Sequence, residues 1–173
     1  MSTMYVDTIQ KADGSSGVHI AGHLIQRVST KFSDAYTNSS QNFADILPAT
    51  ITFTPKYASS LLCITFNTSA NVYTSGTNTN AGGVMRILHD GAGITGDYNA
   101  GGNYELYFQN DAGAGTGPNN YMRQVKYGEI AAGNTNARVI KVQARTYNAT
   151  TAAIRLNQGG LYTSYLIVEE IAQ

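Results

Sequence analysis

Hydrophobic and polar residues alternate with a period of two along most of the chain after about residue 23. This period is typical of β-strands, in which successive side chains point to opposite faces. Residues 61–73 form the longest hydrophobic segment, with Leu62, Ile64 and Phe66 on one face. Further strands are expected at residues 24–32, 46–53, 84–89, 104–109, 121–130, 137–147, 152–157 and 164–171. No window has a helical period, so the pattern predicts an all-β protein.

Glycine, asparagine and serine clusters separate the expected strands. Short strands at a spacing of roughly 10–15 residues are typical of an antiparallel sandwich or barrel. Pro48 interrupts segment 46–53, which predicts an edge strand or a bulge because proline has no N–H to donate. We expect residues 33–44 to form a polar connection without a strand.

The first 22 residues differ from the rest and are predicted to form a short extended N-terminal arm, followed by a head domain over residues 23–173. They hold one short alternating piece and then the turn-rich segment 11–17. This stretch buries too little apolar surface to fold alone, so we expect a partner or sister chains to order it. The arm residues expected to attach the chain are Tyr5, Val6, Ile9 and Ile20.

Composition and charge remove several classes of function. The formal net charge is zero, which argues against nucleic acid as the main partner because phosphate binding needs a surplus of Lys and Arg. The absence of net repulsion between copies is compatible with assembly into a larger object. No apolar run approaches the ~18 residues of a membrane span, and no signal peptide is visible, so we expect synthesis in a cytosol and no membrane insertion. Cys63 lies in the apolar run 61–64 and is expected to be a buried core thiol.

Three glycines match a cofactor-binding motif. Gly91, Gly93 and Gly96 satisfy G-x-G-x-x-G after an expected strand, and Asp111 lies about twenty residues further on. Dinucleotide binding requires a helix that opens at the third glycine and holds the pyrophosphate at its N-terminus. Residues 97–103 are poor helix formers, whereas Asp-Gly at 90–91 is a strong hairpin signal. We therefore interpret the motif as a glycine turn and expect no cofactor.

The histidines do not indicate a metal site. His19 and His23 have a spacing of four, which suits zinc on a helix, but the serines and glycines around them argue against a helix. On a strand, both would lie on one face and, in a trimer, cluster around its axis. A structural or solvated role is favoured, and no metal is expected.

Carboxylates and nucleophiles do not form a recognisable catalytic set. Glu169 and Glu170 are adjacent on an expected strand and would point to opposite faces. Glu105 and Glu129 lie in expected strands, but nothing in the sequence brings them together for glycoside cleavage. No Ser–His–acid or Cys–His arrangement has a local signature. The sequence predicts that the chain is not an enzyme.

Tyrosines carry the strongest indication of a binding surface. The chain has 12 Tyr and no Trp, with many Asn, Gly and Ser residues in its expected loops, and this combination is typical of adaptable binding surfaces. Tyrosines that flank the glycine-rich loops can stack on sugars, pack against a neighbouring subunit, or fill half-buried strand positions. The candidate surface-binding residues are Tyr73, Asn78, Asn80, Tyr98, Asn103, Asn119 and Tyr121.

Several short strings together resemble a known family. Residues 1–10, the Gly-Ser-Ser-Gly turn and residues 18–26, with their Gly-His-hydrophobic-hydrophobic-Gln string, are similar to the start of small tail-fibre and virion-appendage proteins of tailed bacteriophages, especially marine and cyanobacterial ones. Segments 51–56 and 61–66 resemble the family's paired strands, and segment 84–91 resembles its Arg-Asp-Gly hairpin. The ending 164–171 resembles its closing strand.

The resemblance implies a homotrimer with jelly-roll-like sandwich heads, assembled in the host bacterial cytoplasm and located in the virion. It implies contacts of the arm with other virion proteins, and either host-surface glycan binding or capsid decoration. The chain has no long shaft, which argues against a long tail fibre and leaves a short fibre, a knob or a head cement protein. The leading expectation is a trimeric short fibre or knob that projects from the particle and contacts the host. The alternatives are a capsid decoration (cement) protein and, from another class, a carbohydrate-binding module or depolymerase.

Overall fold

The computed structural model describes residues 20–74, 81–94, 106–108, 121–146, 152–158 and 162–173, and these ranges contain eleven β-strands and no α-helix. No helix in this part of the chain is therefore long and apolar enough to cross a membrane. The strands are β1 (Leu24–Phe32), β2 (Tyr36–Asn38), β3 (Ala44–Phe53), β4 (Leu61–Thr74), β5 (Ala81–His89), β6 (Ala92–Gly93), β7 (Leu106–Phe108), β8 (Met122–Ala131), β9 (Arg138–Thr146), β10 (Ala152–Leu156) and β11 (Ser164–Ile171).

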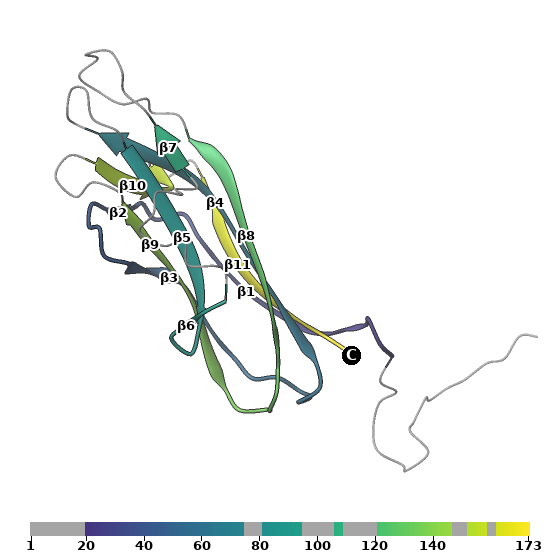
Figure 1. The fold of residues 1–173 in the computed structure, drawn as a ribbon. Helices are drawn as coiled ribbons and strands as arrows, with labels where there is room; N and C mark the ends of the chain where they lie inside the picture. Colours follow the sequence, from purple (N-terminus) through teal and green to yellow (C-terminus); the bar gives the residue numbers. More distant parts are fainter. Residues whose placement is uncertain (1–19, 75–80, 95–105, 109–120, 147–151, 159–161) are drawn as a thin grey trace, which may run out of the picture.

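The strands form two antiparallel sheets packed face to face, with the strands running along the long axis of the sandwich (Figure 1). In the larger sheet, β11 and then β10 pair along one edge of β4, β8 pairs along its other edge, β1 lies outside β11, and β2 lies outside β10. The smaller sheet has the order β3-β9-β5-β6, with β7 also paired to β5. The predicted all-β antiparallel sandwich is confirmed, while a jelly-roll-like arrangement stays a prediction.

The core lies between the sheets and follows the alternation of the sequence. Leu62, Ile64 and Phe66 of β4 are fully buried, as are Ile140 of β9 and Ile87 of β5 in the opposite sheet. Burying large aliphatic and aromatic side chains of this kind stabilises a fold by about 1.5–3 kcal/mol each. The predicted inner face of β4 is therefore confirmed.

Cys63 does not lie where the sequence predicts. It was expected in the core, but it lies on the outward side of β4 and is only half-buried. Its neighbours across the sheet are Glu169 of β11 and Glu129 of β8. The strand period explains the difference, because a residue between Leu62 and Ile64 must point away from the core that both of them face.

Two local predictions have opposite outcomes. Pro48 was expected at an edge or a bulge; β3 is the outermost strand of its sheet, and its register with β9 shifts between Asp45 and Thr50. Segment 33–44 was expected to lack a strand, which is wrong, because β2 pairs with β10 there. The buried Asn38 donates from Nδ2 to the carbonyl of Ala144 at 2.7 Å, a contact made across the sandwich that no local pattern reveals.

A buried carboxylate ties the connection after β3 to the end of β11. Glu170 accepts hydrogen bonds from the backbone N–H groups of Lys56 and Tyr57 at 2.9 Å, from Ser60 Oγ at 2.6 Å and from Gln26 Nε2 at 2.6 Å. Burial opposes ionisation, but these donors together hold the pKa of Glu170 below its ordinary value. The arrangement is structural, because every partner belongs to the fold.

The described part of the predicted arm ends in a turn against the C-terminus. Ile20 is exposed, and Gly22 donates its N–H to the carbonyl of Ala172 at 2.8 Å with a φ of +82° that glycine adopts readily. His23 in turn accepts from the N–H of Ala172 at 2.9 Å. The other predicted arm residues, Tyr5, Val6 and Ile9, lie outside the described residues.

Candidate assembly and binding surface

The outward side chains of β1, β11, β4 and β8 form one continuous surface, named here the outer face. Strand register places them in rows across the sheet. One row reads Lys31, Tyr165, Asn67 and Val125, and the next reads Ser29, Ile167, Thr65 and Tyr127. Val125 is 59% exposed and Tyr127 is 53% exposed, values that are high for large apolar side chains within a strand. The outer face therefore exposes large side chains of β8 and β11 between polar residues of β1 and β4.

Strand β8 is exposed along its outward side and only partly covered along its inward side, where Ile130 packs against the core. Among its ten residues only Gly128 is buried. Lys126 lies opposite Phe66 and so occupies a core-facing position, where burial lowers the pKa of its ammonium group. Along the described chain, β8 pairs with β4 only, so one of its backbone edges faces away from the sheet (Figure 1).

Two asparagines of β4 carry buried polar atoms that make no hydrogen bond. Asn71 is 1% exposed, and neither its Oδ1 nor its Nδ2 has a hydrogen-bond partner among the described residues. In the same part of the chain, Oδ1 of Asn67, four residues earlier on the same face, is likewise buried without a donor. Such atoms are rare in folded proteins, and each costs about 1–3 kcal/mol while it stays unsatisfied.

A tyrosine–arginine cluster (Tyr73, Tyr121, Tyr162 and Arg155) surrounds the end of β4 that contains Asn71. The Arg155 guanidinium lies 3.8 Å from the centroid of the Tyr73 ring, a cation–π contact between β10 and β4. Tyr121 and Tyr162 stack with centroids 5.4 Å apart and an interplanar angle of 27°. Burial raises the pKa of the Tyr121 hydroxyl, and the charge of Arg155 partly offsets this rise, so Arg155 is close enough to act on both Tyr73 and Tyr121.

The cluster contains two of the predicted binding residues and two that the sequence analysis missed. Tyr73 and Tyr121 were selected because they flank glycine-rich loops. Tyr162 follows the pair Gly159-Gly160, so the same rule would have found it. Arg155 lies within a strand and carries no local signal. The remaining candidates lie outside the described residues; these are Asn78, Asn80, Tyr98, Asn103 and Asn119.

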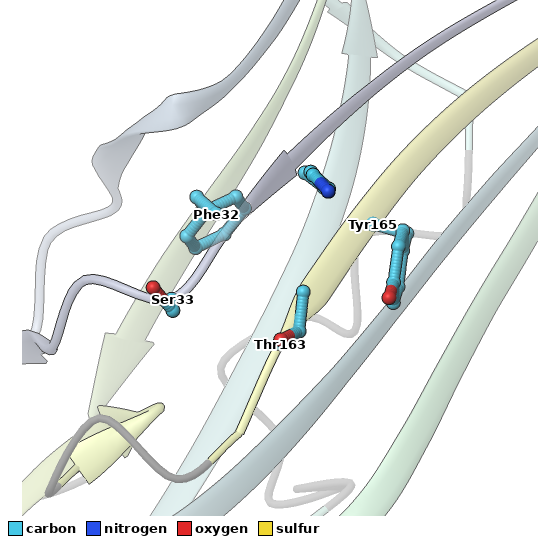
Figure 2. Close-up of a pocket in the computed structure, with 5 residues that line it drawn as sticks. Phe32, Ser33, Thr163 and Tyr165 are labelled. Atoms are coloured by element: carbon cyan, nitrogen blue, oxygen red, sulfur yellow. The ribbon is translucent and has the colours of Figure 1, made fainter.

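A small hollow of about 270 Å³ lies between the end of β1 and the start of β11. Its lining comes from two chain segments, the end of β1 with Lys31, Phe32 and Ser33, and the start of β11 with Thr163 and Tyr165 (Figure 2). Phe32 is also a core residue, stacked on Phe66 with centroids 6.4 Å apart. The hollow is slightly below the usual size of ligand pockets, about 300–1,000 Å³.

Polar side chains on the outward side of the smaller sheet bond one another. Asp45 accepts from Lys141 Nζ at 2.8 Å and from Gln143 Nε2 at 2.6 Å, and these donors lower the pKa of its carboxyl. Gln143 Oε1 accepts from Arg86 Nε at 2.9 Å, and the Arg86 guanidinium lies 3.9 Å from the centroid of the Phe43 ring.

The glycine motif forms a hairpin over its described part. Asp90 and Gly91 have φ values of 48° and 87°, and β6 returns antiparallel to β5 with His89 opposite Ala92. The positive φ at both central residues is that of a type I′ turn, as Asp-Gly predicts. No helix opens after Gly93 within the residues described there, and Gly96 lies beyond them. The interpretation of Gly91 and Gly93 as a turn is confirmed.

The titratable groups outside this surface have structural partners. Arg138, buried between the sheet ends, donates to the carbonyl of Ala132 at 2.6 Å and lies 2.9 Å from His89 Nε2. Burial and the Arg138 charge, opposed by Asp90, lower the pKa of His89. Within the described ranges, no three His, Cys, Asp or Glu side chains gather to hold a metal ion; His19 lies outside them.

The carboxylates also remain separate. Glu169 points outward beside Arg27 at 3.8 Å while Glu170 points inward, so their predicted opposite orientation is confirmed. Glu129 accepts a hydrogen bond from the hydroxyl of Tyr127. Its predicted companion Glu105 lies outside the described residues, so their approach stays untested.

Comparison with known proteins adds little to this geometry. No protein-family model matches the chain, and no curated protein matches it. Among solved structures, the chain is similar to one titled "Structure of infectious bursal disease virus Gx strain", with a TM-score of 0.33 and 11% sequence identity. The match covers 100% of this chain and 42% of that chain, so this chain spans less than half of its length. A likeness of this degree carries no argument about function. The geometry defines an antiparallel β-sandwich of two packed sheets.

Proposed function

We propose that this chain is a structural protein of a bacteriophage particle, a homotrimeric short fibre or knob that projects from the virion and contacts a glycan on the host surface. The strings at residues 1–26 and 164–171 support the virion assignment through their resemblance to tail appendages. The sandwich fold is compatible with this role. The N-terminal arm would attach each copy to other virion proteins.

The observation that carries the host-contact part is the tyrosine–arginine cluster beside Asn71. A pyranose ring has an apolar C–H face that stacks on tyrosine, and its hydroxyls need fixed donors and acceptors. The rings of Tyr121 and Tyr162 supply the first, while the guanidinium of Arg155 supplies donors for the second. Three weak sites on one trimer would act together through avidity.

Binding of the purified full chain to host surface polysaccharide tests this proposal. Tyr162→Ala removes a stacking platform and is expected to weaken binding about tenfold, since an aromatic contact contributes about 0.5–1.5 kcal/mol beyond its area. Tyr162→Phe keeps the ring and should bind nearly as well as the wild type. Binding that is equal in all three proteins would refute the role of the cluster.

Location on the particle separates the alternatives. Labelled antibody against the chain should mark the tail or a vertex of the phage. Label distributed over the capsid shell, without polysaccharide binding, would identify a decoration protein instead. Release of sugar from the polysaccharide, abolished by Glu129→Gln, would identify a depolymerase and contradict a purely structural role.

A further inference from the structure

Among the long strands of the described fold, β8 has the largest share of exposed residues, and only one of its ten residues is buried. Its outward Val125 and Tyr127 lie in the same rows as Tyr165 and Ile167 of β11, with the polar Asn67 and Thr65 of β4 between them. A partner that covers Val125 and Tyr127 would therefore also lie over the outward residues of β4 and β11.

We infer that a second copy of this chain covers the outer face, with β8 of one copy packed across the β4–β11 surface of the next, in a closed ring. The inference rests on the proposed homotrimer for the number of copies and assigns the surface by which they meet. Val125, Tyr127, Asn67, Tyr165 and Ile167 form the centre of that contact.

The size of the outer face sets the size of each contact. Ten paired residues extend about 33 Å along the strands, and four strands at about 4.8 Å spacing are about 19 Å wide, which gives about 630 Å² of flat area. In a ring two neighbours share this face, so each contact has about 315 Å² of flat area per partner, below the ~800 Å² of accessible surface that each partner buries in a standard interface. Protruding side chains such as Tyr127 and Tyr165 increase the accessible area above the flat figure.

The charges of the outer face favour a head-to-tail contact. One row reads Arg27, Glu169, Cys63 and Glu129 from the β1 edge to the β8 edge. When copies are related by rotation about an axis along the strands, Glu129 of one copy lies level with Arg27 of the next. Opposite charges then meet at the same height. Heterologous contacts of this kind generate rings when the rotation closes.

A further feature favours packing of β8 on a face over pairing of strand edges. Lys126 points toward the core side of an edge strand, a common device against edge-to-edge addition because pairing would bury its ammonium group.

Two exposed valines provide a matched test. Val125 is 59% exposed on the outer face of β8, and Val139 is 41% exposed on the outward side of the smaller sheet. Sedimentation equilibrium of the full chain should show a trimer for the wild type and for Val139→Glu. Val125→Glu should raise the concentration for half-assembly on the order of 100-fold, as for a central interface residue. Circular dichroism would verify that both variants keep their strands.

Charge reversal tests the direction of packing. Arg27→Glu and Glu129→Arg should each weaken assembly, and the double variant should restore it, because the two residues face each other only in the head-to-tail contact. Failure of the double variant to recover, or dissociation by Val139→Glu instead of Val125→Glu, would overturn the proposed interface while leaving the virion function standing. A monomeric wild type would refute the trimer and the interface together. A trimer disrupted by Val125→Glu but absent from phage particles would refute the virion function alone.

Discussion

Replacement of Glu170 by Ala should be among the most destabilising single changes in the described fold. The carboxylate accepts from two backbone N–H groups, those of Lys56 and Tyr57. Ser60 already has the carbonyl of Tyr57 at 2.7 Å as a second acceptor, so its hydroxyl is not orphaned. Two part-buried N–H groups that lose this acceptor cost about 1–3 kcal/mol each, and water entering the space offsets part of this, so we expect a loss of about 3 kcal/mol.

Thermal unfolding provides the assay, with Glu169→Ala as the control. For a chain of 173 residues, about 3 kcal/mol corresponds to a decrease in Tm of about 6–12 °C. Glu169 is adjacent but outward, and its contact with Arg27 at 3.8 Å is an exposed ion pair, so its removal should cost below about 1 kcal/mol. All variants must be compared at one protein concentration, because the stability of an oligomer depends on it.

The pH dependence of this difference supplies a second readout. The pKa of Glu170 is lower in the folded chain than its ordinary value of 4.5, so the carboxylate stabilises the fold fully above about pH 4.5. That contribution is lost as the pH falls through the folded pKa. The difference between wild type and Glu170→Ala should be constant from pH 7 to 6 and shrink below about pH 4.5. Equal Tm losses for the two glutamate variants, or a difference independent of pH, would refute the reasoning.

Two more predictions concern the smaller sheet. Burial and the charge of Arg138 lower the pKa of His89 in the folded chain, so the unfolded chain binds more protons. The free energy of unfolding should therefore fall as the pH drops below about 6.5. His89→Gln should flatten this pH dependence, measured by urea titration. An unchanged slope would contradict that assignment. Gly83→Ala should cost about 1–3 kcal/mol in the same titrations, because overpacking is destabilising. A Cβ at Gly83 would lie 2.9 Å from Ile154 Cδ1, and a neutral result would show that this side chain yields freely.

Strand positions were predictable because a core on one side of a sheet imposes a period of two on the residues. Residues 24–32 and 164–171 were predicted with the bounds that β1 and β11 have, and β4 extends one residue beyond its prediction. β2 was missed because its three residues depend on β10, which lies more than 110 residues further along the chain. A short polar strand paired over such a separation has no pattern of its own.

The candidate surface was predictable only in part. Tyr73 and Tyr121 were identified from composition and loop position, but their association with Arg155 depends on the register of β10 and β8 against β4. The burial of Asn71 likewise depends on the strands that pair with β4. The prediction for Cys63 was wrong because the apolar residues around it suggested a core environment. Its position between the inward-facing Leu62 and Ile64 instead places its side chain on the outward face of β4.

The sequence by itself determined the all-β class, the inner face of β4 and the Asp-Gly hairpin, since each follows from neighbouring residues and the geometry of an extended backbone. Tertiary structure alone decided which strands lie next to one another, and hence that the apolar outward residues of β11 and β8 join into one face. It also decided that Glu170 is fully bonded and that Asn71 is not. Hydrogen bonding and burial are satisfied by groups distant along the chain, and this is why their outcome cannot be seen in any local segment.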